Sequence, residues 1–77
     1  MTELNRTEKT IIEALGDTTL TVEEIAVKTG YEVSGYFRRT LSSLRKRGIL
    51  ANKRPAYYLK PEYHYLLHNL RDHRLRS

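Results

Sequence analysis

Three glycines divide the first part of this sequence into short helical segments, and this spacing limits what the chain can fold into. Gly16, Gly30 and Gly48 each follow a run of residues with helical apolar spacing. Glycine readily adopts the left-handed conformation that ends a helix. Short amphipathic helices must bury their apolar faces against one another. The sequence therefore predicts one small domain with one modest core.

Residues that typically cap helices stand at the start of each of these helical segments. Asn5 with Glu8, and Thr21 with Glu24, have the spacing of a capping box, in which each side chain satisfies a free backbone N–H of the first turn. Ser34 is well suited to cap the third segment. The sequence therefore predicts three helices, over residues 5–15, 21–29 and 34–47.

The rest of the sequence predicts a small sheet and one more helix. A threonine-rich piece at residues 18–20 favours an edge strand. Two short runs at residues 49–52 and 56–59 flank a basic tip, Lys53-Arg54-Pro55, and predict a β-hairpin. Pro61 suits the first turn of a final helix. The predicted fold class is α+β, mostly helical with a small β-hairpin.

Charge is distributed unevenly along the chain, whose net charge is +5. Residues 1–32 hold seven acidic and three basic side chains, whereas residues 33–77 hold two acidic and eleven basic ones. This asymmetry favours a basic surface that faces a polyanion such as nucleic acid. The alternative is a basic protein with no such partner.

Several classes of protein are disfavoured by the motifs that the sequence lacks. The absence of cysteine disfavours a disulfide framework and a thiolate zinc site, and it agrees with a cytoplasmic location, at the nucleoid or, for a viral protein, inside the host. There is no long apolar run and no signal-peptide pattern. Without a phosphate-binding glycine loop or a nucleophile motif, we expect no enzyme activity, no cofactor, no small-molecule ligand and no membrane contact.

A metal site is also disfavoured. His64, His68 and Asp72 share one face of the expected final helix. Two full turns separate the first from the last of them, so they do not define three ligands of one ion. Surface histidines are therefore the favoured interpretation.

The helix expected over residues 34–47 has one apolar and one cationic face. Phe37, Leu41 and Leu44 recur at i, i+4 and i+7, so they face the core. At about 100° per residue, the opposite face then carries cations and small hydroxyl side chains, and no carboxylate. The outward residues are Gly35, Arg39, Ser42, Ser43 and Lys46, and the flanking ones are Tyr36, Arg38, Arg45 and Arg47. A helix of this width fits the major groove of B-DNA.

The order of the elements resembles that of the winged helix-turn-helix DNA-binding regulators of bacteria, archaea and their viruses. The multiple-antibiotic-resistance and arsenical-resistance regulator families are the most similar in style. The resemblance is carried by three stretches: Leu20 to Ala26 leading to Gly30, Phe37 to Leu50, and Tyr57 to Leu59. It implies a single domain over residues 1–77, with a winged-helix core at residues 4–60 and a C-terminal helix at residues 61–75.

The function that this resemblance implies is sequence-specific binding of double-stranded DNA by a small transcriptional regulator, which we interpret as a repressor. The helix at residues 34–47 would enter the major groove, and the wing at residues 52–56 would reach the backbone or the minor groove. Arg38 and Arg39 are candidates for guanine, because a guanidinium can bond O6 and N7 together. The expected DNA-contact residues are Ser34, Gly35, Tyr36, Arg38, Arg39, Ser42, Ser43, Lys46, Lys53 and Arg54.

Other interpretations of these features stay open. Arg45, Lys46 and Arg47 also suit the negative end of a helix dipole, which is a structural role. A winged helix can instead serve as a protein-interaction module, although the basic face disfavours it. Recognition of RNA or an unusual duplex is a further alternative. Z-form-binding winged helices use an asparagine and a tyrosine where this chain has Arg38 and Ser42, which disfavours the Z-form.

The final helix must bury its apolar stripe, which consists of Tyr63, Leu66, Leu67 and Leu70. We expect part of the stripe to pack on the domain's own core and the rest on a second copy, as in regulators that resemble this chain. Such a homodimer would hold two DNA-reading helices about 34 Å apart on a palindromic site. The alternative is a monomer whose last helix folds back on its own core.

Overall fold

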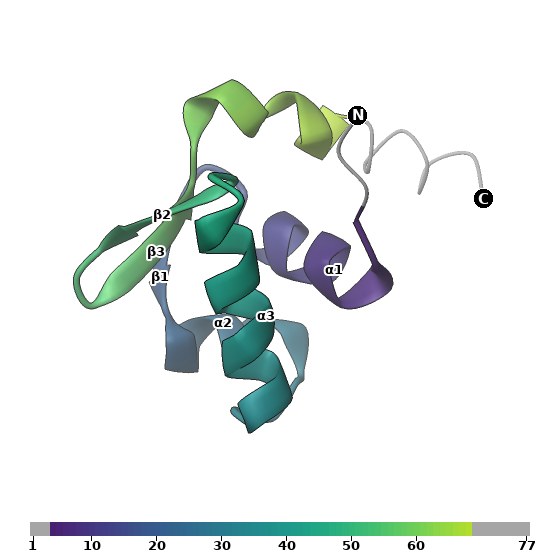
Figure 1. Ribbon diagram of the computed structural model, residues 1–77, viewed down its shortest axis with the longest axis vertical. Helices are drawn as coiled ribbons and strands as arrows, with labels where there is room; N and C mark the ends of the chain where they lie inside the picture. The colour runs from purple at the N-terminus through teal and green to yellow at the C-terminus, as the bar shows by residue number, and fades with distance from the viewer. Residues whose placement is uncertain (1–3, 69–77) are drawn as a thin grey trace.

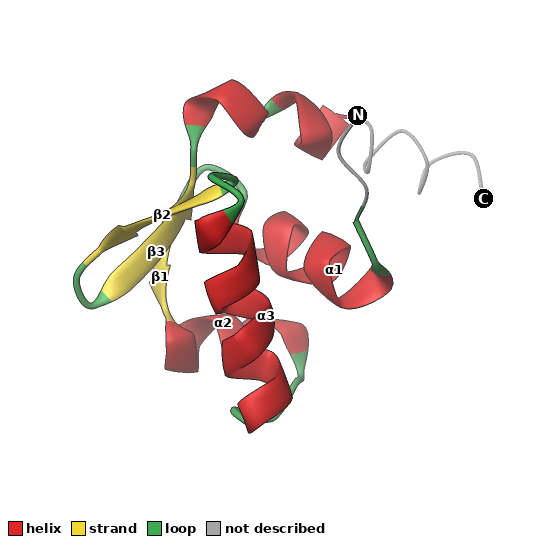
Figure 2. Cartoon of the chain, viewed as in Figure 1, coloured by secondary structure: helices red, strands yellow, loops and turns green. Residues whose placement is uncertain are grey.

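The computed structural model describes residues 4–68 of the chain. Its elements are α1 (Arg6–Leu15), β1 (Thr19–Thr21), α2 (Val22–Thr29), α3 (Gly35–Lys46), β2 (Leu50–Lys53), β3 (Ala56–Leu59) and the 3-10 helix η1 (Pro61–Tyr63), after which residues 65–68 are helical (Figure 2). The predicted α+β class is confirmed at this level. No helix within residues 4–68 is long and apolar enough to cross a membrane.

The predicted caps begin helices α1, α2 and α3. Asn5 Oδ1 accepts the Glu8 N–H at 2.8 Å, while Glu8 Oε1 accepts the Asn5 N–H at 2.9 Å. Thr21 and Glu24 form the same reciprocal pair, and Ser34 Oγ accepts a backbone N–H in the first turn of α3. These bonds satisfy N–H groups that have no partner inside their helices. The helix starts predicted from the sequence are therefore confirmed.

The end of α3 turns the chain directly into the hairpin. Gly48 has a φ of 80°, its N–H donates to the Arg45 carbonyl at 3.0 Å, and the Ile49 N–H donates to the Leu44 carbonyl at 3.0 Å. This is a Schellman motif, in which the residue after the left-handed glycine packs an apolar side chain back on the helix. Ile49 is buried accordingly. The motif fixes the angle at which β2 leaves α3.

A three-stranded antiparallel sheet has the order β1-β3-β2. β1 is the predicted edge strand, one residue later than expected. β2 pairs with β3 as far as Lys53 opposite Ala56, so the turn consists of Arg54 and Pro55, which a cis peptide bond joins. The predicted basic tip over residues 53–55 is corrected to two residues, because Lys53 takes part in the last strand pair.

The core lies between the sheet and the helices. Its fully buried large side chains come from α1, α2, α3, the start of the hairpin and β3: Ile11, Ile12, Leu15, Ile25, Phe37, Leu41, Leu44, Ile49, Leu50 and Leu59. The three residues predicted to form the inward face of α3 are among them. Because that face is buried, the opposite face of α3 is left for contacts outside the domain.

The final segment begins at the predicted residue, Pro61, but its first turn is a 3-10 helix. His64 separates η1 from the helical residues 65–68, and its N–H donates to the Pro61 carbonyl at 3.0 Å. The His64 ring also ties this turn to the end of β3, since its Nε2 lies 3.2 Å from the Leu59 carbonyl oxygen. Tight 3-10 turns are common at helix starts. The predicted final helix therefore begins at Pro61 with a 3-10 turn and continues as helical residues 65–68, and the part of the prediction beyond residue 68 lies outside the described residues.

Candidate nucleic-acid interface

Helix α3 crosses the middle of the molecule, with the hairpin on one side and α1 on the other (Figure 1). The sequence missed one member of its inward face. Thr40 is 7% exposed, and its Oγ1 donates to the Tyr36 carbonyl oxygen at 2.9 Å. This bond to the preceding turn lets a polar residue occupy a buried position. The observed inward face is thus wider than the predicted apolar stripe.

The predicted DNA-contact residues of α3 lie outside the core. Ser42 and Ser43 are half-buried. The exposed members are Ser34, Gly35, Tyr36, Arg38, Arg39 and Lys46. Residues 35–46 include no carboxylate. A surface with cations and no anion produces a positive potential that attracts a polyanion.

The two flanks of this surface face different elements. Tyr36 lines a hollow together with Thr7 of α1, and Arg47 is bonded to α1 as well. At about 100° per residue, Arg38 and Arg45 then fall on the opposite flank. That flank faces the hairpin (Figure 1). The cations of α3 therefore extend from its outward face toward the hairpin.

The hairpin adds two cations at its far end. Lys53 closes β2 and Arg54 opens the turn, and both are exposed. The hairpin projects from the body of the molecule beside α3 (Figure 1). Strand β2 packs against α3, so the element that carries the predicted wing residues is a neighbour of the helix that carries the other predicted residues.

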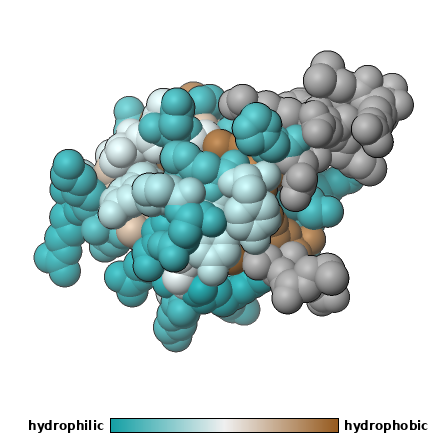
Figure 3. All heavy atoms as spheres, turned by 90° about the horizontal axis from the view of Figure 1, so that it is seen from above, coloured by the Kyte–Doolittle hydropathy of each residue, from teal (hydrophilic) through white to brown (hydrophobic). Residues whose placement is uncertain are grey.

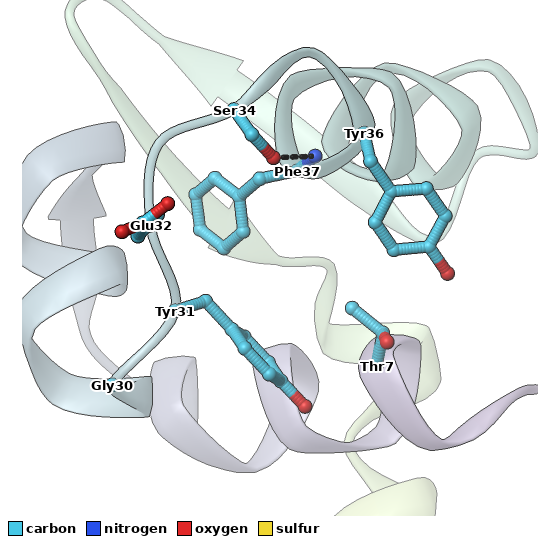
Figure 4. Close-up of a pocket in the computed structure, with 7 residues that line it drawn as sticks. All are labelled: Thr7, Gly30, Tyr31, Glu32, Ser34, Tyr36 and Phe37. Atoms are coloured by element: carbon cyan, nitrogen blue, oxygen red, sulfur yellow. Dashed lines mark hydrogen bonds between the residues drawn. The ribbon is translucent and has the colours of Figure 1, made fainter.

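A small hollow of about 250 Å³ adjoins the first turn of α3 on the side of α1 (Figure 4). The Tyr31 ring packs on the Phe37 ring there, with centroids 6.2 Å apart. The Tyr36 ring points toward Thr7 and α1, although Tyr36 is 57% exposed. The Tyr36 ring is therefore turned toward α1, away from the outward face of α3.

Arg47 has a structural partner that the sequence did not indicate. Its Nη1 donates to Glu8 Oε2 at 2.8 Å, and the same carboxylate caps α1 through its other oxygen. The capping role of Glu8 is visible as a local spacing. The ion pair joins residues 39 positions apart, so no local pattern could reveal it.

The residues predicted for a dimer interface are largely used within the single chain. Leu66 and Leu67 are each 8% exposed and belong to the core, and Tyr63 packs against the same core. Tyr65 is 51% exposed and its ring stacks on Tyr63 with centroids 6.3 Å apart. Figure 3 shows this end of the molecule as mostly hydrophilic, with apolar atoms visible between polar side chains. Leu70 lies outside the described residues, and the homodimer stays a prediction.

The described residues include no group of three histidine, cysteine or acidic side chains that could hold a metal ion. The His64 ring is bonded to a backbone carbonyl instead, and Asp72 lies outside residues 4–68.

No family model and no curated protein matches this sequence. The function of the chain must therefore be inferred from the surface that α3 and the hairpin present.

Proposed function

We propose that this protein is a winged helix-turn-helix domain that binds double-stranded DNA sequence-specifically and acts as a small transcriptional regulator. In this proposal α2 and α3 form the helix-turn-helix, α3 enters the major groove, and the β2–β3 hairpin is the wing. The order of the elements and the strand order β1-β3-β2 are compatible with that fold. The observation that carries the proposal is the exposed face of α3, which holds cations and hydroxyls without a carboxylate.

The base-reading part of the interface is the first half of α3. By a spacing of about 100° per residue, Arg39 falls near the centre of the exposed face, and Arg38 falls beside it on the flank opposite Tyr36. The small side chains of Gly35 and Ser42 next to Arg39 let the helix lie close to the base edges. Each guanidinium can bond O6 and N7 of a guanine together. We therefore expect a preferred site that contains guanine.

The remaining cations serve to hold the domain on the phosphate backbone. Arg45 and Lys46 are exposed in the last turn of α3, and Lys53 and Arg54 are exposed at the end of the hairpin. Contacts of this kind fix the register of a protein on the duplex but carry no sequence information. Such a domain represses by occupying an operator. A homodimer formed through the final segment would bind a palindromic operator.

Fluorescence anisotropy with labelled duplexes at low salt tests this proposal, after selection of a preferred site from a random-sequence pool. Arg39→Ala should weaken binding to the preferred site by about 1–3 kcal/mol and relax its sequence preference. Lys9→Ala is the control, because Lys9 is an exposed cation on α1, and it should bind as the wild type does. Absence of wild-type binding to any duplex at low salt would refute the proposal.

A further inference from the structure

The two flanks of α3 offer different groups to a duplex. Arg38 and Arg45 fall on the flank that faces the hairpin, whereas Tyr36 and Arg47 lie on the α1 side. Arg47 Nη1 donates to Glu8 Oε2 at 2.8 Å. The Tyr36 hydroxyl, in contrast, has no hydrogen-bond partner among residues 4–68. Of these two side chains on the α1 flank, Tyr36 is therefore the one whose polar group is available to a ligand.

A helix that lies in the major groove has a phosphate strand on either side of it. The groove is about 12 Å wide, and a helix with its side chains is about 10–12 Å across. Tyr36 precedes Arg39 by three residues, which places it about 60° from the centre of the exposed face of α3, on the α1 side. A side chain at this angle faces the wall of the groove, where the phosphates lie, rather than the base edges on its floor.

The hollow beside Tyr36 has room for a phosphate group. Its volume is about 250 Å³, whereas one water molecule occupies about 30 Å³ in the liquid. Tyr36 and Thr7 lie at one end of this hollow and Glu32 lies at the other (Figure 4). The Glu32 carboxylate repels a phosphate, so the end that suits a phosphate is that of Tyr36 and Thr7. Tyr36 is 57% exposed, which leaves its hydroxyl within reach of a duplex.

We infer that Tyr36 is a phosphate-binding residue, whose hydroxyl donates to a backbone phosphate on the α1 side of the major groove. The domain is then held on the backbone from both sides of α3, by the hairpin cations on one side and by a neutral hydroxyl on the other. Because this hydroxyl carries no charge, it adds nothing to the release of counterions by the lysines and arginines. This inference rests on the proposed function.

Duplex binding by Tyr36→Phe tests the inference, because this substitution removes the hydroxyl and keeps the ring. Loss of one hydrogen bond to a charged group should weaken binding by roughly tenfold. The preferred duplex and a random duplex should be weakened by the same factor, since a phosphate contact carries no sequence information. A loss confined to the preferred duplex would show that Tyr36 reads a base, and it would overturn the inference.

Tyr65→Phe is the matched control for this variant. Tyr65 is 51% exposed, close to the value for Tyr36, but it lies in the final segment. The substitution removes the same hydroxyl and should leave the affinity for both duplexes unchanged. An equal loss of affinity in Tyr65→Phe would show that the effect is not specific to the hollow, and it would overturn the inference.

A set of preferred duplexes, each with an ethyl group on one phosphate, locates the contact. Ethylation at one position should weaken binding by the wild type and have no effect on Tyr36→Phe, because that variant has already lost the contact. Lys53→Ala should become insensitive at a different position. If the wild type and Tyr36→Phe are sensitive at the same positions, Tyr36 contacts no phosphate and the inference is overturned.

The inference and the proposed function fail in different ways. Wild-type protein that binds no duplex at low salt refutes the proposed function, and this inference with it. Wild-type protein that binds duplex DNA, together with Tyr36→Phe that binds equally well, overturns the inference alone.

Discussion

The affinity of this protein for duplex DNA should fall steeply as the salt concentration rises. Within the described residues, α3 and the hairpin carry six exposed cations outside the Glu8–Arg47 pair: Arg38, Arg39, Arg45, Lys46, Lys53 and Arg54. If Arg38 and Arg39 read bases, the other four neutralise phosphates. If Arg38 and Arg39 displace counterions as well, all six cations contribute to the salt dependence of binding.

These counts give the magnitude of the effect. Each phosphate that a protein neutralises on B-DNA contributes about −0.9 to the slope of log affinity against log salt. Four to six contacts therefore predict a slope between about −3.6 and about −5.4. A fourfold rise in salt, from about 50 to about 200 mM, would then weaken binding by roughly two to three orders of magnitude.

Anisotropy titrations of one labelled random duplex at several salt concentrations measure this slope. Lys9→Ala, whose cation lies on α1, should give the wild-type value. A wild-type slope shallower than about −2 would refute the proposed interface, because most of the six cations would then lie away from the phosphates.

Two further predictions concern the wing and the core. Lys53→Ala should weaken the preferred duplex and a random duplex by the same factor in competition titrations, since a phosphate contact reads no sequence; loss of discrimination would contradict this role. Leu44→Ala should lower the free energy of unfolding by about 2–5 kcal/mol in urea denaturation, because Leu44 is 0% exposed and leaves a cavity. That is a large part of the roughly 4–12 kcal/mol typical of a chain this size, and a loss below about 1 kcal/mol would contradict the tight packing of α3 on the core.

Local signals in the sequence predicted most of the elements and the composition of the candidate site. Asn5, Thr21 and Ser34 mark the helix starts because capping bonds join residues only three positions apart. The inward face of α3 follows from its apolar spacing, and the exposure of Arg39 follows from that face. Each of these inferences depends on the geometry of a single helix, which the sequence contains.

Only the tertiary structure determined which side chains of different elements contact one another. The sequence predicts only a helix-capping role for the Glu8 carboxylate. Its bond to Arg47 forms because α1 packs on α3 and brings the two side chains together. In the same way, Leu66 and Leu67 form a stripe that either a partner or the domain itself can cover, and the path of the chain after β3 buries them in the domain's own core. Spacing along one helix determines which face is apolar or charged, whereas the packing of distant segments determines what that face contacts.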